Sequence, residues 1–500
     1  MALNPVERRL LYLCNHWSAF TGNASKRLLL WQMQDNAVRI VQGFFEVQKH
    51  QTDFTTGDMF IVFDTPFENS IQYSRALKEM LVGRYQASHD DLRAEGITPD
   101  WVFDPATVPH SVAGFVESMR SFGSHHQESI GLLVAVLMPS QMRLEAYDAF
   151  GDWLARALAA NLPGQLRLVV VDSVEHPRLG KLTAHPLVYV DAPEIDAFQT
   201  AQESFAQEGV GPAAVFSSLL MALMTLVERA PADQAKAKAA DATAFARQQG
   251  WVDQEAAVAV MLSGAFLKEK RFDEALQAND HAREMAQKAV EADHPAGRQL
   301  VMQTWFGEAG IHFAAGDLLK AADAYQQAGI LAQDVPNAVL AVEGLRMEAF
   351  CRSRAGHTDA AIQAGQNAIA LGSHLQPDLR LMSTLPIAAL DLLRMLDARC
   401  VERMEKISNR AKARESDAFQ ALERQAAKLE NRRDLASFDV AETQYTNQLQ
   451  AAQQTVDQEL LAAAGGGNRR FVEAFENARQ LLGPQWPMAA LAMLAPPGQP

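Results

Sequence analysis

Hydrophobic residues follow two different patterns along this chain of 500 residues. In the first 200 residues, short and nearly continuous apolar runs alternate with amphipathic stretches. The apolar runs cover residues 59–63, 130–137, 166–171 and 187–190. A strand that is apolar at almost every position is typical of a parallel sheet covered on both faces. The pattern therefore predicts an α/β domain over residues 1–200, with a mostly parallel sheet.

The amphipathic stretches between these runs predict helices at about 70–88, 111–121 and 141–160. Residues 24–49 precede the first apolar run, and we interpret them as a pair of helices or as one long helix. Strands that alternate with helices in this way are joined by right-handed crossovers, so we expect the helices to cover both faces of the sheet.

From about Gly211 the strand patterns end, and apolar residues recur at spacings of three and four residues. This is the period of one face of a helix, and proline and glycine break it at intervals. We therefore expect an all-helical array over residues 211–395. The longest apolar stretch, 213–227, is shorter than the ~20 residues that span a bilayer. We interpret it as a fully buried core helix.

Small residues recur in this array in three units, at fixed offsets of twelve and then seven residues. The three sets are Ser263/Ala275/Ala282, Ala309/Ala321/Ala328 and Ala349/Ala361/Ala368. Trp305 and Leu345 lie four residues before the first small residue of the second and third units. Two antiparallel helices approach closely only where both present small side chains, and a large residue fills the adjoining gap.

These positions resemble the tetratricopeptide repeat (TPR), whose helix A has Trp and a small residue and whose helix B has Ala, an aromatic residue and Ala. The residues that match are Trp305, Ala309, Ala321, Tyr325 and Ala328. The units are 46 and 40 residues apart, whereas the family repeats every 34, so the helices or loops are longer here. The resemblance implies a solenoid of helical hairpins. A generic alanine-rich bundle is the alternative.

The resemblance also implies that helix A residues line a groove that binds a partner protein. The corresponding residues here are Gln303, Phe306, Phe313, Glu343, Arg346 and Phe350. Exposed aromatic side chains beside an arginine have the composition of a binding hot spot. The alternative is that these phenylalanines belong to the core, packed under the next hairpin.

The last third of the chain contains a long segment, 397–464, that lacks proline and glycine. It is rich in good helix formers, so we predict one very long helix or a helical hairpin over residues 396–464. Residues 465–500 begin with Gly465–Gly467, which predicts a flexible break. A short amphipathic helix and an apolar tail follow. The tail, 485–500, either caps its own solenoid or docks on a partner.

Charge and cysteine content narrow the classes of partner and compartment. The net charge is −15, from 60 acidic and 45 basic residues. Such a field repels nucleic acids and anionic membrane surfaces, so we expect neither nucleic-acid binding nor membrane insertion. Three cysteines, far apart in the sequence, cannot form a disulfide framework or a structural zinc site. They are typical of a reducing compartment, and we expect a cytoplasmic protein.

Motifs for nucleotide or metal chemistry are incomplete. A phosphate loop needs glycines where a strand enters a helix, and residues 64–68 and 138–141 have none. Residues 178–183 contain Gly180-Lys181 but have Leu182 at the Ser/Thr position. Polar residues after the strands are ligand candidates or ordinary helix caps: Asp64, Glu68, Asp172 and His176. His125 and His126, with Glu128, lie in a loop, and adjacent histidines rarely point the same way. We expect no catalytic residue, metal or cofactor.

Together these patterns predict a non-enzymatic adaptor, scaffold or chaperone-like protein that binds another protein or a peptide segment through its repeats. The resemblance implies a bacterial protein, and adaptors for secretion effectors are one class that it suggests. The alternative is an α/β-domain enzyme or a sensor of a small ligand such as a nucleotide, regulated by the helical repeats.

Overall fold

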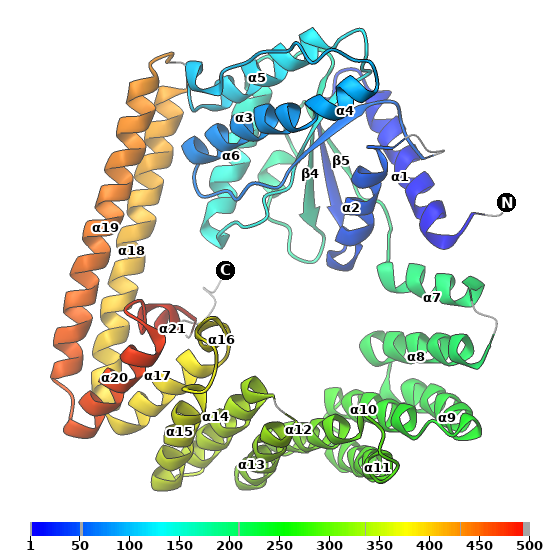
Figure 1. Cartoon of the computed structure of the whole chain (residues 1–500), viewed down its shortest axis with the longest axis vertical. Helices are drawn as coiled ribbons and strands as arrows, with labels where there is room; N and C mark the ends of the chain where they lie inside the picture. The colour runs from blue at the N-terminus through cyan, green and yellow to red at the C-terminus, as the bar shows by residue number, and fades with distance from the viewer. Residues whose placement is uncertain (1–2, 51–53, 209–210, 336, 431, 494–500) are drawn as a thin grey trace. The chain divides into compact units, whose positions relative to one another are not determined.

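The computed structural model describes residues 3–50, 54–208, 211–335, 337–430 and 432–493 (Figure 1). The chain divides into two compact units. Unit 1 consists of residues 1–207 and 413–452, and unit 2 consists of residues 208–412 and 453–500. The segment predicted as a separate region, 396–464, is therefore shared between both units.

Unit 1 contains a sheet of five strands in the order β2-β3-β4-β1-β5. The strands are β1 (Leu28–Met33), β2 (Met59–Phe63), β3 (Leu133–Leu137), β4 (Leu166–Ser173) and β5 (Val188–Asp191). Every neighbouring pair is parallel. The predicted α/β fold with a mostly parallel sheet is confirmed.

Helices cover both faces of this sheet (Figure 1). The helices of unit 1 up to residue 208 are α1 (Pro5–Thr21), α2 (Val38–Val47), α3 (Ser70–Ala87), α4 (His89–Ala94), α5 (Val112–His125), α6 (Tyr147–Ala159) and α7 (Ala197–Glu208). Side chains of β1 alternate between two cores: Leu29 and Trp31 pack with α1 and α2, whereas Leu28 and Leu30 pack with α3, α5 and α6. Because both faces are buried, the strands are apolar at most positions.

The prediction of a helix over residues 24–49 was wrong in its first part. Residues 28–33 form β1, which pairs with β4 on one side and β5 on the other. The run Leu-Leu-Leu-Trp-Gln-Met consists mostly of helix formers, and its strand conformation is imposed by the two neighbouring strands. Only residues 38–47 are α-helical, as α2.

Unit 2 begins with a solenoid of helices in which each helix packs against the next. These helices are α8 (Pro212–Arg229), α9 (Ala232–Gln249), α10 (Val252–Lys268), α11 (Phe272–Glu291), α12 (Gly297–Ala315), α13 (Leu318–Asp334), α14 (Ala338–Arg354) and α15 (Thr358–Gly372). The three predicted units correspond to α10–α11, α12–α13 and α14–α15. The predicted all-helical array is confirmed.

The small residues of the repeat lie where the helices meet. All nine are buried, and the most exposed of them, Ser263, is only 5% exposed. The turns inside the hairpins have left-handed residues: Gly316 at φ 86°, Gly356 at φ 85° and Lys270 at φ 60°. Lys270 stands where the first unit lacks the glycine, so the same turn is made there at a steric cost.

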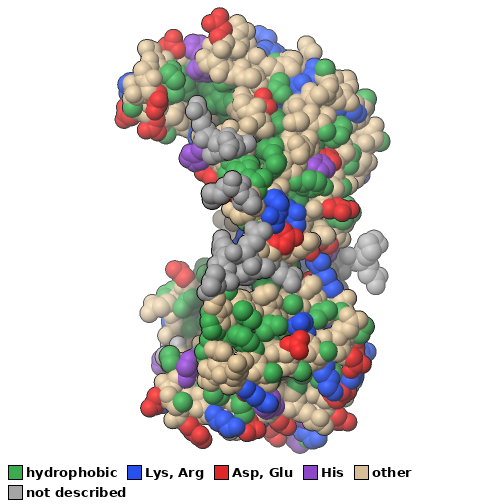
Figure 2. Space-filling model, turned by 90° about the vertical axis from the view of Figure 1, so that its right-hand side faces the viewer, with side chains coloured by type: hydrophobic (Ala, Val, Ile, Leu, Met, Phe, Trp, Pro, Cys, Tyr) green, Lys and Arg blue, Asp and Glu red, His purple; other side chains and the backbone are tan. Residues whose placement is uncertain are grey.

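The interpretation of residues 213–227 as a fully buried core helix was wrong. They lie in α8, of which only Phe216 and Leu223 are buried, while Val215 is 47% and Met224 43% exposed. α8 is the first helix of the solenoid and packs against α9 and α10. Figure 2 shows hydrophobic side chains on the surface of this end of unit 2, in the lower half of the view. Among the described residues, α8 alone is long and apolar enough to cross a membrane by length and composition.

The C-terminal third forms the helical hairpin that was one of the two predicted alternatives. This part of the chain contains the helices α16 (Pro377–Met382), α17 (Leu385–Leu396), α18 (Ala398–Leu429), α19 (Leu435–Gly465), α20 (Arg469–Leu482) and α21 (Met488–Met493). α18 and α19 are the two arms of the hairpin. The part of each arm within residues 413–452 belongs to unit 1, and the remainder belongs to unit 2.

The predicted flexible break at Gly465–Gly467 is instead a packed turn. Asn468 caps α20 and donates from Nδ2 to the Leu396 carbonyl at 2.7 Å. The Cα of Gly467 approaches Phe471 so closely that a Cβ would lie 2.5 Å from the ring. The tail then continues into the core of unit 2, where Trp486 is buried and donates to the Pro386 carbonyl. This is the self-capping alternative, and residues 494–500 lie outside the described part.

Candidate functional site

The predicted partner-binding residues lie on two helices, α12 and α14, and they differ in exposure. Gln303 is exposed, and Phe313 is 39% exposed. The Phe313 ring lies 6.1 Å from the ring of Phe350, so the two consecutive A helices meet at this aromatic pair. The exposed Arg354 places its guanidinium carbon 5.9 Å from the centre of the Phe350 ring. We call Phe313, Phe350 and Arg354 the aromatic patch.

Phe306 and Arg346 are more deeply engaged within unit 2. The Phe306 ring lies 6.2 Å from Tyr325 on α13, which is the core alternative for this residue. Arg346 donates to both carboxylate oxygens of Glu343 at 2.7 Å, and it lies 3.7 Å from Asp391 on α17. Burial raises the pKa of Asp391. The Glu343–Arg346–Asp391 network therefore joins α14 to α17.

Two contacts of this surface were not found from the sequence. Arg354 lies beyond the helix A positions that the repeat pattern marks, although it is eight residues after Arg346 on the same helix. Trp305 is covered by the guanidinium of Arg283 on α11, at 3.8 Å from the ring centre. Repeat periodicity marks the tryptophan but not the cation above it, because the two belong to different units.

The carboxyl ends of β1 to β4 surround a cavity of about 650 Å³, which we call the strand-end cavity. Of the four polar candidates from the sequence, Asp64 and Asp172 line it. Glu68 lines a separate cavity of about 460 Å³, and His176 lies 3.4 Å from Asp35. The structure therefore brings two of the four candidates together.

Asp172 is a structural residue of its loop. Its carboxylate is buried and accepts hydrogen bonds from the backbone N–H groups of Ser173, Arg178 and Leu179, at 2.9 to 3.1 Å. This is the cap-like role that was the alternative to ligand binding. Asp64 forms an ion pair with Arg84 at 3.1 Å.

The loops at this end of the sheet do not fit a nucleotide phosphate. After β1 the chain continues as Gln34-Asp35-Asn36-Ala37, with no glycine and with a carboxylate in the first turn of a short 3-10 helix, Asp35–Ala37. The positive end of a helix attracts anions, but Asp35 would repel them. The Gly180-Lys181 pair lies in another 3-10 helix, Gly180–Leu182, where Lys181 pairs with Asp148 at 2.8 Å.

The histidine pair and the cysteines have ordinary surroundings. His125 lies 2.7 Å from the Asp100 carboxylate, and its ring meets the ring of His126 nearly edge on. Among the residues that the structure describes, no three His, Cys, Asp or Glu side chains are close enough to hold a metal ion together. Burial raises the pKa of the Cys351 thiol to about 11, which disfavours the thiolate.

A dense group of polar contacts in unit 1 was not predicted at all. Glu423 of α18 and Glu430, the residue that follows α18, cap the N-termini of two helices on the sheet. Glu423 accepts from the backbone N–H and the hydroxyl of Ser70, at 2.7 and 2.5 Å, at the start of α3. Glu430 accepts from the N–H of Ala113 at 2.7 Å, in the first turn of α5. A carboxylate is stabilised by the free N–H groups of a helix start.

Arg156 of α6 lies between the two glutamates. It donates to Glu430 at 3.2 Å and to the Ser70 hydroxyl at 2.8 Å, and it is 4.0 Å from Glu423. Burial raises the pKa of both carboxyl groups. We call Ser70, Ala113, Arg156, Glu423 and Glu430 the carboxylate clasp.

Further ion pairs lie around the clasp, and their charges are arranged in the same way. The α/β part supplies the basic residue and the hairpin supplies the acidic one, as in Arg75–Glu442 at 2.6 Å and Arg143–Glu415. Between them, Phe419, Leu422 and Phe438 of the hairpin are buried in the main core of unit 1. The clasp is therefore an architectural contact. The sequence does not indicate it, because each glutamate lies more than 260 residues from the residues that it contacts.

No family model matches this sequence, and no curated protein matches it. Solved structures that resemble it include a Rap protein complexed with competence and sporulation factor, at 11% identity and a TM-score of 0.26, over 97% of this chain and 99% of that one.

A second is a structure of Drosophila ORC bound to AT-rich DNA and Cdc6, at 12% identity and a TM-score of 0.29, over 97% of this chain and 77% of that one. A third is a signal transduction ATPase with numerous domains and a tetratricopeptide repeat sensor, from Pyrococcus horikoshii, at 9% identity and a TM-score of 0.22, over 97% and 96%. At these TM-scores the three likenesses carry no argument about fold or activity.

Proposed function

We propose that this protein is a non-enzymatic adaptor that binds another polypeptide on the A helices of its solenoid. The observation on which the proposal rests is the aromatic patch. Phe313 is a large apolar side chain that stays exposed although its neighbour Phe350 is half-buried. An exposed phenylalanine that contacts a second aromatic ring beside an arginine has the composition of a protein-binding hot spot.

Two features of the α/β part favour a non-enzymatic role over a nucleotide-driven one. The loop after β1 has an aspartate where a phosphate would need backbone amides and glycine. The acidic residue at the end of β4, Asp172, is fully used by three backbone N–H groups. Asp35 would repel a phosphate, and the carboxylate of Asp172 has no free oxygen to offer a ligand.

Phe313→Ala tests the proposal in the full-length protein. We expect capture of the partner polypeptide from a lysate of the source organism to fall by about tenfold, because truncating a hot-spot residue costs more than 1 kcal/mol. Leu319→Ala on α13 is the matched control, since Leu319 is 43% exposed and outside the patch. The captured amount of one stoichiometric protein, followed by mass spectrometry, is the measurement.

The control should capture as much partner as the wild type, and both variants should melt at the wild-type temperature. Equal capture by Phe313→Ala and the wild type would contradict the assignment of the binding surface. Capture of no stoichiometric protein by the wild type would contradict the adaptor function itself.

A further inference from the structure

The strand-end cavity has the place and size of a small-molecule site. It lies at the carboxyl ends of parallel strands, which is where open α/β sheets bind ligands. Its volume of about 650 Å³ is within the range of pockets that hold small organic molecules. Much of its lining is apolar and comes from several elements of unit 1, with Met33, Phe45, Val62, Leu137 and Phe150 among the lining residues.

The two basic side chains that line the cavity are each paired with an acidic one of the same lining. Arg84 pairs with Asp64 at 3.1 Å, and Lys49 pairs with Glu46 at 2.6 Å. The two basic groups of the lining are therefore neutralised, while Asp35 adds a further negative charge to it. An anionic ligand would meet no unpaired cation on these described lining residues. This arrangement favours an uncharged ligand.

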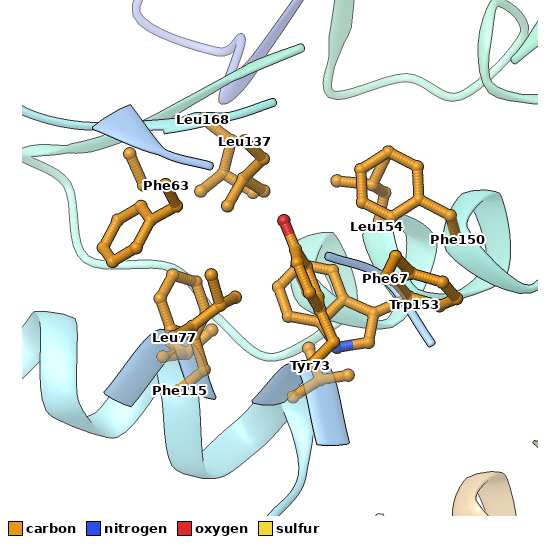
Figure 3. Packing of buried hydrophobic residues seen from close by; sticks show 14 of the residues in the cluster. Phe63, Phe67, Tyr73, Leu77, Phe115, Leu137, Phe150, Trp153, Leu154 and Leu168 are labelled. Carbon is orange, nitrogen blue, oxygen red and sulfur yellow. The ribbon is translucent and has the colours of Figure 1, made fainter. Parts of the chain in front are cut away.

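Tyr73 lies behind the cavity lining and does not belong to it. Its side chain is fully buried, and its hydroxyl has no hydrogen-bond partner. Buried tyrosine hydroxyls usually find a partner, because an unpaired one costs free energy. Figure 3 shows this hydroxyl pointing between Leu137 on one side and Phe150 on the other. Both of these residues also line the strand-end cavity.

We propose that the strand-end cavity binds an uncharged, mostly apolar small molecule. The apolar lining binds the body of the ligand. The two ion pairs of the lining and the negative charge of Asp35 select against phosphates and other anions. This site is independent of the aromatic patch in unit 2, so the two proposals stand or fall separately.

The test uses the full chain and two fluorescent probes of opposite character. Nile red is uncharged and has a carbonyl acceptor, whereas anilinonaphthalene sulfonate is an anion. We expect Nile red to bind with one saturable site, and the anion to bind at least tenfold more weakly. Val62→Trp fills the cavity from β2 and should weaken Nile red binding at least tenfold. Val190→Trp, on β5 and outside the cavity lining, is the matched control and should bind as the wild type.

Two further variants keep the test decisive. Gln42→Trp covers the cavity from an exposed position of α2, so it tests the site even if Val62→Trp does not fold. Tyr73→Phe removes a buried hydroxyl that lies outside the lining, so this variant should bind Nile red as the wild type does and be at least as stable. Absence of Nile red binding to the wild type would overturn the proposal. So would wild-type binding by a folded Val62→Trp or Gln42→Trp variant, or equal binding of the anionic probe.

Discussion

Glu423 and Glu430 are acidic residues that the fold removes from water. Their charges are compensated by the N–H groups of Ser70 and Ala113 and by Arg156. Removing water penalises the charged form of a carboxyl group, and burial is the leading reason why both pKa values are raised. These two side chains therefore connect the stability of unit 1 to pH.

Replacing both glutamates by glutamine should remove this dependence. In the wild type, the folded pKa values lie above the ordinary value of 4.5. The two protonated carboxyl groups thus add to the free energy of unfolding, and this addition is fully present below pH 4.5. It is lost as the pH rises through the raised pKa values. The stability of the wild type relative to Glu423→Gln/Glu430→Gln should fall over this interval and stay constant at neutral pH.

Urea denaturation of both proteins at several pH values between 4 and 7.5 measures this difference. The double variant Glu46→Gln/Glu284→Gln changes two exposed glutamates whose pKa values are lowered, and it should show the opposite slope. A constant difference across the whole range would show that the clasp carboxyl groups titrate normally.

At the scale of helices, the solenoid depends on close approach at small residues. One close approach joins α13 and α14, where a Cβ on Gly344 would lie 2.7 Å from the Cα of Gly329 and 2.9 Å from the Tyr325 carbonyl oxygen. Both neighbours are backbone atoms, so no side chain can move away to make room. The small residues thus set the spacing of the hairpins.

Gly344→Ala should therefore destabilise the protein by about 1–3 kcal/mol, the usual cost of overpacking. Gly310→Ala is the matched control, because a Cβ at Gly310 on α12 meets nothing within 4 Å. Gly310→Ala should instead stabilise the helix by about 0.5–1 kcal/mol through helix propensity. Thermal unfolding followed by circular dichroism distinguishes them, and equal melting temperatures would contradict the importance of this contact.

Sequence patterns predicted those helices and strands whose conformation depends mainly on their own residues. The alanines at 309, 321 and 328 mark helix contacts because their spacing follows from helix geometry alone. Strand β1 was missed because its residues favour a helix until β4 and β5 pair with them. Of the candidate site residues, Phe313 was proposed from its repeat position and stays a prediction, whereas Asp391, Arg354 and the clasp depend on tertiary contacts that no local pattern contains.

For the whole molecule, unit 1 is built from two distant segments of the chain. Residues 413–452 complete the core that residues 1–207 begin, through Phe419, Leu422 and Phe438. Burying each such side chain stabilises by about 1.5–3 kcal/mol. Three of them together account for an amount comparable to the total stability of a typical domain, about 5–15 kcal/mol. The predicted domain of residues 1–200 is therefore incomplete.

A fragment of residues 1–207 should accordingly lack a cooperative unfolding transition when it is produced alone. Co-expression with a fragment of residues 413–452 should restore the transition and the near-ultraviolet circular dichroism of the buried tryptophans. A version of the second fragment with Phe419→Asp and Phe438→Asp is the control and should not restore them. Cooperative unfolding of 1–207 alone would show that the hairpin adds nothing essential to this core.

The carboxylate clasp also decides how the protein would respond to a break in its backbone. The chain leaves unit 1 once after residue 207 and enters unit 2. It comes back to unit 1 at residues 413–452, which contain the end of α18 and the start of α19. If a protease cut the chain once at 208–211, the amino-terminal piece would stay bound to Glu423 and Glu430, which belong to the other piece. The two pieces would stay associated, as a heterodimer derived from one chain.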